Sequence, residues 1–314
     1  MKVLFTGASS FSGSWFAHTL ASKGHDVTVT CTRTEDAYQD LRARRIDRLK
    51  SSCSIVWNTA FGDDRFVDLI AADRFDILCV HGAYVHDYRS DEFPIDVALA
   101  SNTHRLPSVL KGAKGRGVAK VVLTGSVFEA DEGLGETPLR AFSPYGLSKT
   151  LTAQTFRFWC DRLGVPLAKF VIPNPFGPYE EPRFTHYLMS TWVKGGIAGV
   201  KTPAYVRDNI HVSLLALAYA DFVVRTPTAA FEKLGPSGYV ESQGAFALRF
   251  AREMESRMQL PCRLQITPQT DFSEPTTRIN TNRPNSVALG WDESAAWDEL
   301  ASYYRSILGF KLPD

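Results

Sequence analysis

Residues 2–13 read KVLFTGASSFSG, a short apolar run that breaks into a turn containing two glycines. Apolar residues at helical spacing follow, so the stretch predicts a strand, a tight turn and a helix. The N-terminus of such a helix binds the pyrophosphate of a dinucleotide. Ser10 stands at the place of the middle glycine of the usual motif, which weakens the motif but offers a hydroxyl to a phosphate oxygen. The expected phosphate-binding residues are Gly7, Ser9, Ser10, Phe11 and Gly13; the alternative is the same turn without a ligand.

Apolar runs and helical patterns alternate along the first half of the chain. This alternation predicts an α/β fold of the Rossmann type, a doubly wound parallel sheet with helices on both faces. After Pro173 the rhythm is lost, and prolines punctuate loops and short helices. We expect a dinucleotide-binding domain over 1–173, completed by later segments, and a smaller, mainly substrate-binding lobe over 174–314. The expected strands are 2–6, 26–31, 54–58, 76–80, 120–124 and 167–172.

Residues 143–149, SPYGLSK, place Tyr145 and Lys149 four positions apart on a helix that Pro144 opens. Residues at this spacing share a face, so a phenol and an ammonium project into the same pocket. A free tyrosine loses its proton near pH ~10, and a neighbouring cation favours the phenolate. The pair therefore predicts a general acid/base for proton transfer.

Composition and charge exclude several classes of protein. The chain has 314 residues, of which 44% are hydrophobic, and a formal net charge of +1, so no general attraction to nucleic acid or anionic membranes is expected. The five cysteines are scattered, without a C-x-x-C pair, so we expect reduced thiols and no metal site. No apolar run is long enough to span a membrane, and a strand at residue 2 leaves no room for a signal peptide. A cytoplasmic protein is expected.

In its motifs and their order, the whole chain resembles the extended short-chain dehydrogenases/reductases, specifically the NAD(P)-dependent nucleotide-sugar epimerases and dehydratases. The resemblance implies a Rossmann fold, a nicotinamide cofactor and a nucleotide-sugar substrate. Besides the turn at 7–13 and the Tyr145–Lys149 pair, the matching segments are 62–65 (GDDR), 81–83 (HGA), Asn102, 121–126 (VVLTGS), 174–178 (NPFGP), 207–212 (RDNIHV) and 289–291 (LGW).

The same resemblance implies roles for single residues. Tyr145 exchanges the proton, and Lys149 holds the nicotinamide ribose. Asn102 helps to hold the backbone of the active site. An aspartate after the third strand, Asp63 or Asp64, is implied to contact the adenine ring. The turn His81-Gly82-Ala83 is implied to lie beneath the cofactor.

The catalytic hydroxyl belongs to Ser126 or to Thr124. Ungapped alignment selects Ser126, which we prefer because it needs no deletion in a strand, whereas matching residues 127–128 to the Val-Tyr of the family selects Thr124. In family dehydratases an acid pair follows this hydroxyl, but Ser126 is followed by valine and phenylalanine. A 4,6-dehydratase is therefore disfavoured relative to an epimerase or ketoreductase, although acidic residues lie close by within 129–132.

The end of the second expected strand bears on the choice between NAD and NADP. An acidic residue there would hold the ribose hydroxyls of NAD, but Cys31 occupies that position. Thr32 and Arg33 offer a hydroxyl and a guanidinium suited to a 2′-phosphate. We therefore expect NADP in preference to NAD, while Glu35 would still suit the ribose of NAD.

Cationic side chains in the expected substrate lobe suit a nucleoside diphosphate. For Arg207 we favour a phosphate contact over an ion pair with its neighbours. Two other functions stay open: reduction of a small non-nucleotide ketone, and a non-catalytic NAD(P)-binding sensor, although sensors commonly lose a catalytic residue. The expected substrate residues are His86, Asn174, Arg183 and Arg207.

The helix that carries Tyr145 is apolar over more than the one stripe needed to cover a sheet, through Leu151, Phe156, Phe158 and Trp159. A second apolar face needs a partner, and the resemblance implies a homodimer packed through this helix. The alternative is burial of both faces within one subunit. The basic run at 42–48 is interleaved with acidic residues and predicts a solvated helix face.

Overall fold

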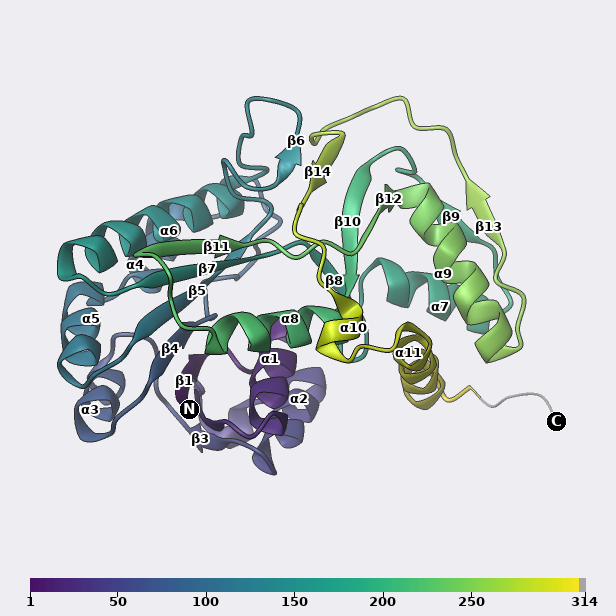
Figure 1. The fold of residues 1–314 in the computed structure, drawn as a ribbon. Helices are drawn as coiled ribbons and strands as arrows, with labels where there is room; N and C mark the ends of the chain where they lie inside the picture. Colours follow the sequence, from purple (N-terminus) through teal and green to yellow (C-terminus); the bar gives the residue numbers. More distant parts are fainter. Residues whose placement is uncertain (311–314) are drawn as a thin grey trace. The chain divides into compact units, whose positions relative to one another are not determined.

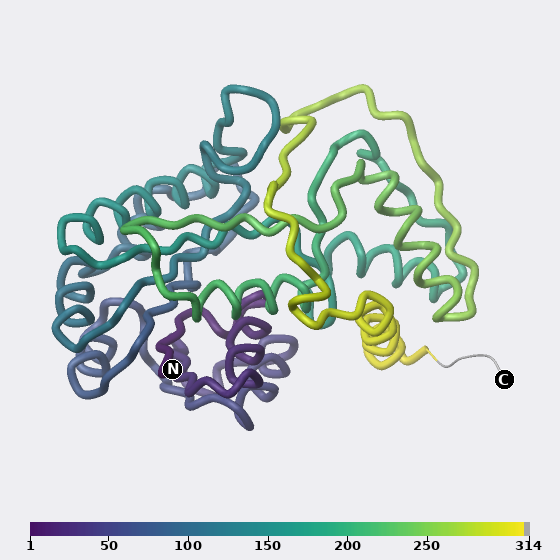
Figure 2. The backbone as a smooth tube through the Cα atoms, in the orientation of Figure 1, coloured from purple at the N-terminus to yellow at the C-terminus, as the bar shows by residue number. Residues whose placement is uncertain are grey.

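The computed structural model describes residues 1–310, which form two compact units. The first unit comprises residues 1–132, 138–172 and 216–235. The second comprises residues 133–137, 173–215 and the chain from 236 onward. In Figure 2 the green segment at 216–235 returns to lie beside the purple and blue parts of the chain. A late segment thus completes the first unit.

The first unit is built on a seven-stranded sheet in the order β11-β7-β5-β4-β1-β2-β3 (Figure 1). Every neighbouring pair of strands is parallel, which confirms the predicted Rossmann-type fold. The strand order reverses between β1 and β4, and ligands of such sheets bind at the carboxyl ends there. One strand, β11, lies outside the predicted segments. The strands are β1 Lys2–Thr6, β2 Asp26–Thr30, β3 Ser54–Val56, β4 Ile77–Val80, β5 Lys120–Ser126, β7 Leu167–Ile172 and β11 Phe231–Leu234.

Successive side chains of a strand point to opposite faces of the sheet, and the strands here are apolar at nearly every position. Both faces of the sheet are therefore apolar, and helices cover both. Leu4 and Leu123 pack in one cluster with Phe156. Phe170 points to the other face, where its ring centroid lies 5.8 Å from that of Phe16. Both faces are closed to ligands by this packing. The helices are α1 Phe11–Ser22, η1 Glu35–Ala37, α2 Asp40–Lys50, α3 Asp64–Ala72, α4 Ile95–Asn102, α5 Leu106–Gly115, α6 Pro144–Leu163 and α8 Val212–Val224.

Capping residues determine where α1 and α6, the two helices nearest the site, begin and end. Ser10 caps α1 by accepting a hydrogen bond from the Gly13 nitrogen. Ser143 caps α6 in the same way, with proline at the first helical position, and Gly164 ends the helix with a φ of 61°. The helical start at Pro144 therefore agrees with the prediction, and it puts Tyr145 in the first turn.

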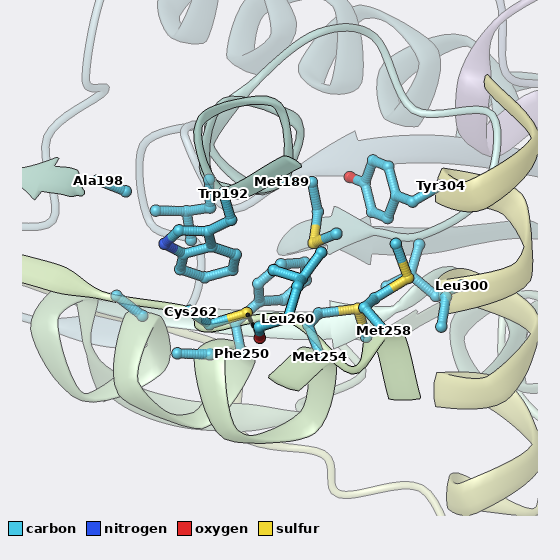
Figure 3. Close-up of a cluster of buried hydrophobic side chains, with 14 of the residues drawn as sticks. Met189, Trp192, Ala198, Phe250, Met254, Met258, Leu260, Cys262, Leu300 and Tyr304 are labelled. Atoms are coloured by element: carbon cyan, nitrogen blue, oxygen red, sulfur yellow. Dashed lines mark hydrogen bonds between the residues drawn. The ribbon is translucent and has the colours of Figure 1, made fainter. Parts of the chain in front are cut away.

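The second unit combines small sheets with helices. Its strand β10 pairs with β8, β12 and β14. Trp192, Phe250 and Met254 lie in its apolar core (Figure 3). No helix among residues 1–310 is long and apolar enough to cross a membrane. The elements are β6 Leu134–Gly135, β8 Asn174–Phe176, α7 Phe184–Val193, β9 Ala198–Val200, β10 Val206–His211, β12 Tyr239–Ser242, α9 Gln243–Met258, β13 Leu264–Ile266, β14 Thr277–Ile279, α10 Ser286–Leu289 and α11 Glu293–Leu308.

Candidate active site

The glycine turn between β1 and α1 lies at the carboxyl end of the parallel sheet. Gly7 has a φ of 78°, and a Cβ there would come within 2.5 Å of the Gly82 nitrogen. A Cβ on Gly13 would come within 2.3 Å of the Gly7 oxygen. Glycine is therefore needed at both places for the turn to pack against the end of β4 and the start of α1. The N-terminus of α1 is presented where a dinucleotide pyrophosphate binds in this fold.

Ser10, at the place of the middle glycine, forms hydrogen bonds within the turn. Its hydroxyl donates to the Gly7 oxygen at 2.8 Å and accepts from the Gly13 nitrogen at 3.2 Å. The hydroxyl proton of Ser10 is therefore used in the hydrogen bond to the Gly7 carbonyl. The expected bond from this hydroxyl to a phosphate stays a prediction, and it would require the hydroxyl to give up its bond to the Gly7 carbonyl.

His81 joins the glycine turn to the two central strands. Its Nδ1 lies 3.0 Å from Thr124 Oγ1, and its Nε2 lies 3.1 Å from Ser10 Oγ. Its ring stacks on Phe5 with centroids 5.6 Å apart. Burial and the charge of Lys149 lower the pKa of His81 to about 3, so the imidazole is neutral at physiological pH. Among residues 1–310, no group of three or more possible ligands could hold a metal ion.

Tyr145 and Lys149 project from the start of α6 beside the end of β5. Lys149 is 6% exposed, and its Nζ donates to the Thr124 carbonyl at 2.7 Å. Burial lowers the pKa of Lys149, an effect that the carboxylate of Glu129 opposes. The Tyr145 ring meets Tyr88 edge-on, with centroids 5.5 Å apart. The phenol is thus held by an aromatic neighbour, and a buried ammonium lies one helical turn away along the same face.

Asn102, at the end of α4, links the segment after β4 to α6. Its Oδ1 accepts from the Tyr84 nitrogen at 2.7 Å, and its Nδ2 donates to Thr152 Oγ1 at 3.2 Å. Both ends of a buried amide are therefore satisfied by groups on different elements. Such contacts suit a residue that holds the active-site backbone, which is the role the resemblance implies.

The two candidate hydroxyls on β5 differ in what they contact. Thr124 Oγ1 lies against the His81 ring, inside the packed sheet. Ser126, the last residue of β5, accepts at its Oγ from the Phe128 nitrogen at 3.2 Å. A hydroxyl that accepts from the backbone keeps its proton available for another acceptor. The choice of Ser126 over Thr124 as the catalytic hydroxyl stays a prediction, and the contacts of Ser126 leave its proton free for it.

A buried charge cluster lies behind the end of β5, and sequence reasoning missed it. Lys169 Nζ on β7 lies 2.5 Å from Glu129 Oε2 and 2.8 Å from Glu132 Oε1. Lys233 Nζ lies 3.0 Å from the other oxygen of Glu132. Burial lowers the pKa of Lys169, but the two carboxylates more than offset this, so the pKa is raised. These glutamates are bound to lysines, which argues against their serving as the acid pair of a dehydratase.

The end of β2 carries a second feature that the sequence did not reveal. Cys31 is buried, while Thr32 and Arg33 are exposed beyond the strand. Arg45, in contrast, is only 1% exposed, and its Nη1 donates to the Ser9 carbonyl in the glycine turn at 3.4 Å. The expected solvated basic face at 42–48 is therefore wrong for Arg45, which packs against the glycine turn, whereas Arg42 and Arg44 are exposed as expected.

The two aspartates after β3 have different partners. Asp63 caps α3, and its two carboxylate oxygens accept from the nitrogens of Phe66 and Ala60 at 2.7 and 2.8 Å. Asp64 is exposed and lies 2.5 Å from Arg105. The structure thus shows a capping role for Asp63, while the adenine contact implied by the resemblance stays a prediction for both residues.

The candidate substrate residues lie in both units. His86 is exposed in the loop after β4 of the first unit. In the second unit, Asn174 begins β8, and its Nδ2 is buried without a hydrogen-bond partner among residues 1–310. Arg183 immediately precedes α7. Arg207 lies 2.8 Å from Glu274 and donates to the Pro275 carbonyl at 3.0 Å, so the ion pair that we ranked second is present.

One known family matches the larger part of the chain. Residues 3–221 match the NAD dependent epimerase/dehydratase family. The chain belongs to this family. No curated protein sequence matches the chain significantly.

Solved structures of similar fold cover almost the whole chain. The UDP-glucose 4-epimerase of Thermotoga maritima has a TM-score of 0.75 at 16% identity, and 98% of this chain aligns with 100% of that one. The UDP-glucuronic acid 4-epimerase of Bacillus cereus, solved with UDP-glucuronic acid and NAD, has the same TM-score, identity and coverage. The dTDP-glucose 4,6-dehydratase DesIV of Streptomyces venezuelae has a TM-score of 0.70 at 19% identity, with 98% of each chain covered. At these identities the similarity shows the fold alone.

Membership of this family gives the general class of the protein. The family is one of NAD-dependent epimerases and dehydratases, so the general class of the chain is that of an NAD-dependent epimerase or dehydratase. The glycine turn fits such a cofactor, since it opens a helix N-terminus at the carboxyl ends of the strands. The preference for NADP over NAD stays a prediction, as do the roles of the single site residues.

Proposed function

We propose that this enzyme is an epimerase or ketoreductase that transfers a hydride at a sugar carbon of a nucleotide-diphosphate sugar, with Tyr145 as the general acid/base. The observation that carries the proposal is the buried ammonium of Lys149, held by the Thr124 carbonyl on the helical face that Tyr145 shares. A cation fixed there favours the phenolate, which is the form that accepts a proton.

The reaction divides between the cofactor and the side chains of the chain. When bound, the nicotinamide cofactor supplies the acceptor and donor of the hydride. Tyr145 takes the proton of a substrate hydroxyl as the C–H bond on the same carbon breaks, so the alcohol becomes a ketone. In the reverse direction Tyr145 returns the proton to the oxygen. Ser126 donates a hydrogen bond to that oxygen, which stabilises the charge that develops on it.

For the cofactor, we propose that the turn at 7–13 holds the pyrophosphate and that Lys149 holds the nicotinamide ribose. The exposed Thr32 and Arg33 beyond β2 support a preference for NADP, because both offer donors to a 2′-phosphate. Dissociation constants measured for both oxidised cofactors test this preference. Arg33→Ala should weaken NADP binding about tenfold, by about 1.4 kcal/mol, and leave NAD binding unchanged. Tighter binding of NAD by the wild type would refute the preference.

For the substrate, we propose that Asn174, Arg183 and Arg207 of the second unit contact the nucleoside diphosphate, and that His86 lines the sugar site. Arg207 would have to exchange its partners at Glu274 and Pro275 for a phosphate, so its contribution is expected to be the weakest of the four. Reduction of a small non-nucleotide ketone and a non-catalytic sensor role are the alternatives. A 4,6-dehydratase is disfavoured, because the glutamates near Ser126 are bound to lysines.

We also propose a cytoplasmic homodimer. All five cysteines are unpaired thiols, as expected in a reducing compartment. Phe158 on α6 is 57% exposed, Leu147 on the same helix 40%, and Val97 on α4 47%. These exposed apolar side chains supply a face that a second copy would cover.

A ligand screen followed by turnover measurements tests the main proposal. Nucleoside diphosphates and their sugars are added with NADP or NAD, and a ligand that binds only the folded protein raises the melting temperature. The stabilising sugar is then assayed for turnover with the wild type and with Tyr145→Phe, which should lose about 10²–10⁴-fold in kcat but keep its cofactor affinity. Stabilisation by apolar ketones alone would favour the small-ketone reductase, and unchanged turnover in Tyr145→Phe would refute its assigned role.

A further inference from the structure

On one side of β5, Thr124 and Ser126 extend beyond the end of the neighbouring strand β4, while on the other side β7 pairs with β5 as far as Ser126. The pairing of β4 with β5 ends at Val80 and Leu123, whereas β5 continues to Ser126. Backbone groups of residues 124–126 that point toward β4 therefore find no strand there. Buried N–H and C=O groups need partners, so other parts of the chain must supply them.

Two charged side chains supply those partners. Lys149 donates to the Thr124 carbonyl at 2.7 Å. Glu129 Oε1 accepts from the Ser126 nitrogen at 2.7 Å, while the Ser126 hydroxyl accepts from the Phe128 nitrogen at 3.2 Å. Ser126 is thus fixed at its amide and at its hydroxyl, and the carboxylate that holds the amide is completely buried.

Glu129 is kept in place by Lys169. The Lys169 Nζ lies 2.5 Å from the second oxygen of Glu129, which leaves the first oxygen to the Ser126 amide. Gly125 makes room for the lysine, since a Cβ there would lie 2.6 Å from Lys169 Cε. A buried carboxylate without its cation would be strongly destabilised, so the lysine is a condition for the contact with Ser126.

We propose that Glu129 and Lys169 are positioning residues, whose buried ion pair holds the Ser126 backbone, and through it the Ser126 hydroxyl, in place beside Tyr145. The expected effect on turnover rests on the proposed function. An enzyme can lose about 10²-fold in rate when a hydrogen-bond donor in its active site is displaced by about 1 Å. Glu129 and Lys169 can therefore affect turnover although neither contacts the substrate.

Two double variants separate positioning from charge. Glu129→Gln/Lys169→Met removes the ion pair but keeps an oxygen that accepts from the Ser126 amide. Glu129→Leu/Lys169→Met removes the ion pair and the acceptor at similar volume. Both variants break the contact of Lys169 with Glu132 to the same extent and leave that of Glu132 with Lys233, so they differ only at position 129. Replacing a buried ion pair by uncharged groups is often tolerated.

We expect the Gln/Met variant to keep kcat within about threefold of the wild type, and the Leu/Met variant to lose about 10–100-fold in kcat with little change in KM or cofactor affinity. Hydrogen exchange at the Ser126 amide, measured on the cofactor-bound protein, should stay slow in the Gln/Met variant and become at least about tenfold faster in the Leu/Met variant. Equal loss of kcat in both variants would overturn the inference, because charge and not positioning would then be responsible. Unchanged kcat or unchanged exchange in the Leu/Met variant would also overturn it.

The exchange measurement needs no substrate, so it separates this inference from the proposed function. If the wild type turns over no nucleotide sugar, the proposed function fails, while fast exchange at Ser126 in the Leu/Met variant alone still supports the positioning contact. If the wild type is active and exchange does not distinguish the variants, the positioning contact fails by itself.

Discussion

Replacing Lys149 by methionine should abolish most activity while stabilising the fold. Lys149 is 6% exposed, and its ammonium donates a hydrogen bond to the Thr124 carbonyl. Withdrawing such an ion from water costs several kcal/mol even after the protein relaxes, whereas one hydrogen bond to a charged group returns about 1.5–3 kcal/mol. Desolvation therefore exceeds the gain, and Lys149→Met is expected to raise the free energy of unfolding by about 0.5–2 kcal/mol.

The pH dependence of this difference has a definite sign. Burial lowers the pKa of Lys149, so the folded protein releases this proton at a lower pH than the unfolded chain does. Between the two pKa values the unfolded chain holds more protons, and the stability of the wild type rises with pH. The advantage of Lys149→Met is thus fully present below the lowered pKa of Lys149 in the folded protein, and it shrinks as the pH rises from there toward about 10.4, the ordinary value for lysine.

Lys120→Met is the matched control, because Lys120 is also buried and lies at the other end of β5. Its Nζ donates to the carbonyls of Phe222 and Arg225 at 3.0 and 2.6 Å, at the end of α8. Two lost hydrogen bonds outweigh the relief from burial, so this variant should lose about 1–2 kcal/mol of stability and keep its turnover.

Urea unfolding at several pH values, with kcat and cofactor affinity measured in parallel, decides the matter. We expect Lys149→Met to lose about 10²–10³-fold in kcat and to bind the cofactor more weakly. A loss of rate with unchanged cofactor affinity would speak against the ribose contact. A Lys149→Met protein less stable than the wild type at pH 7 would refute the reasoning about desolvation.

Three further changes test other parts of the structure. Gly125→Ala should lower stability by about 1–3 kcal/mol in urea unfolding, since the added Cβ would lie 2.6 Å from Lys169 Cε; an unchanged midpoint would contradict that packing. Ser126→Ala should reduce kcat more than Thr124→Val, and the reverse order would move the catalytic hydroxyl to Thr124. Light scattering at micromolar concentration should give twice the chain mass of 34.9 kDa, and Phe158→Glu should return the protein to that mass; a wild type at 34.9 kDa would refute the dimer.

Several features of the site could be predicted from the sequence because they depend on neighbours along the chain. The turn at 7–13 needs glycine for reasons of backbone conformation, and the spacing of Tyr145 and Lys149 follows from the pitch of a helix. Strand positions were predictable for the same reason, since runs of apolar residues bounded by turns fit a sheet buried on both faces.

The tertiary structure alone decided which charged groups are buried and what they bind. Lys169 meets Glu129 across 40 positions of sequence, and Arg45 meets the Ser9 carbonyl across 36. Nothing near these residues in the chain distinguishes them from solvated charges, because a charge is tolerated inside a protein only when distant segments bring it a partner. The strand β11 was also missed from the sequence. It has only four residues, and its place in the sheet depends on its pairing with β7, which lies far away in the sequence. The sequence by itself therefore determined the fold class and the helical face that Tyr145 and Lys149 share, whereas the contacts of Ser126 and Lys149 form only when the chain is folded.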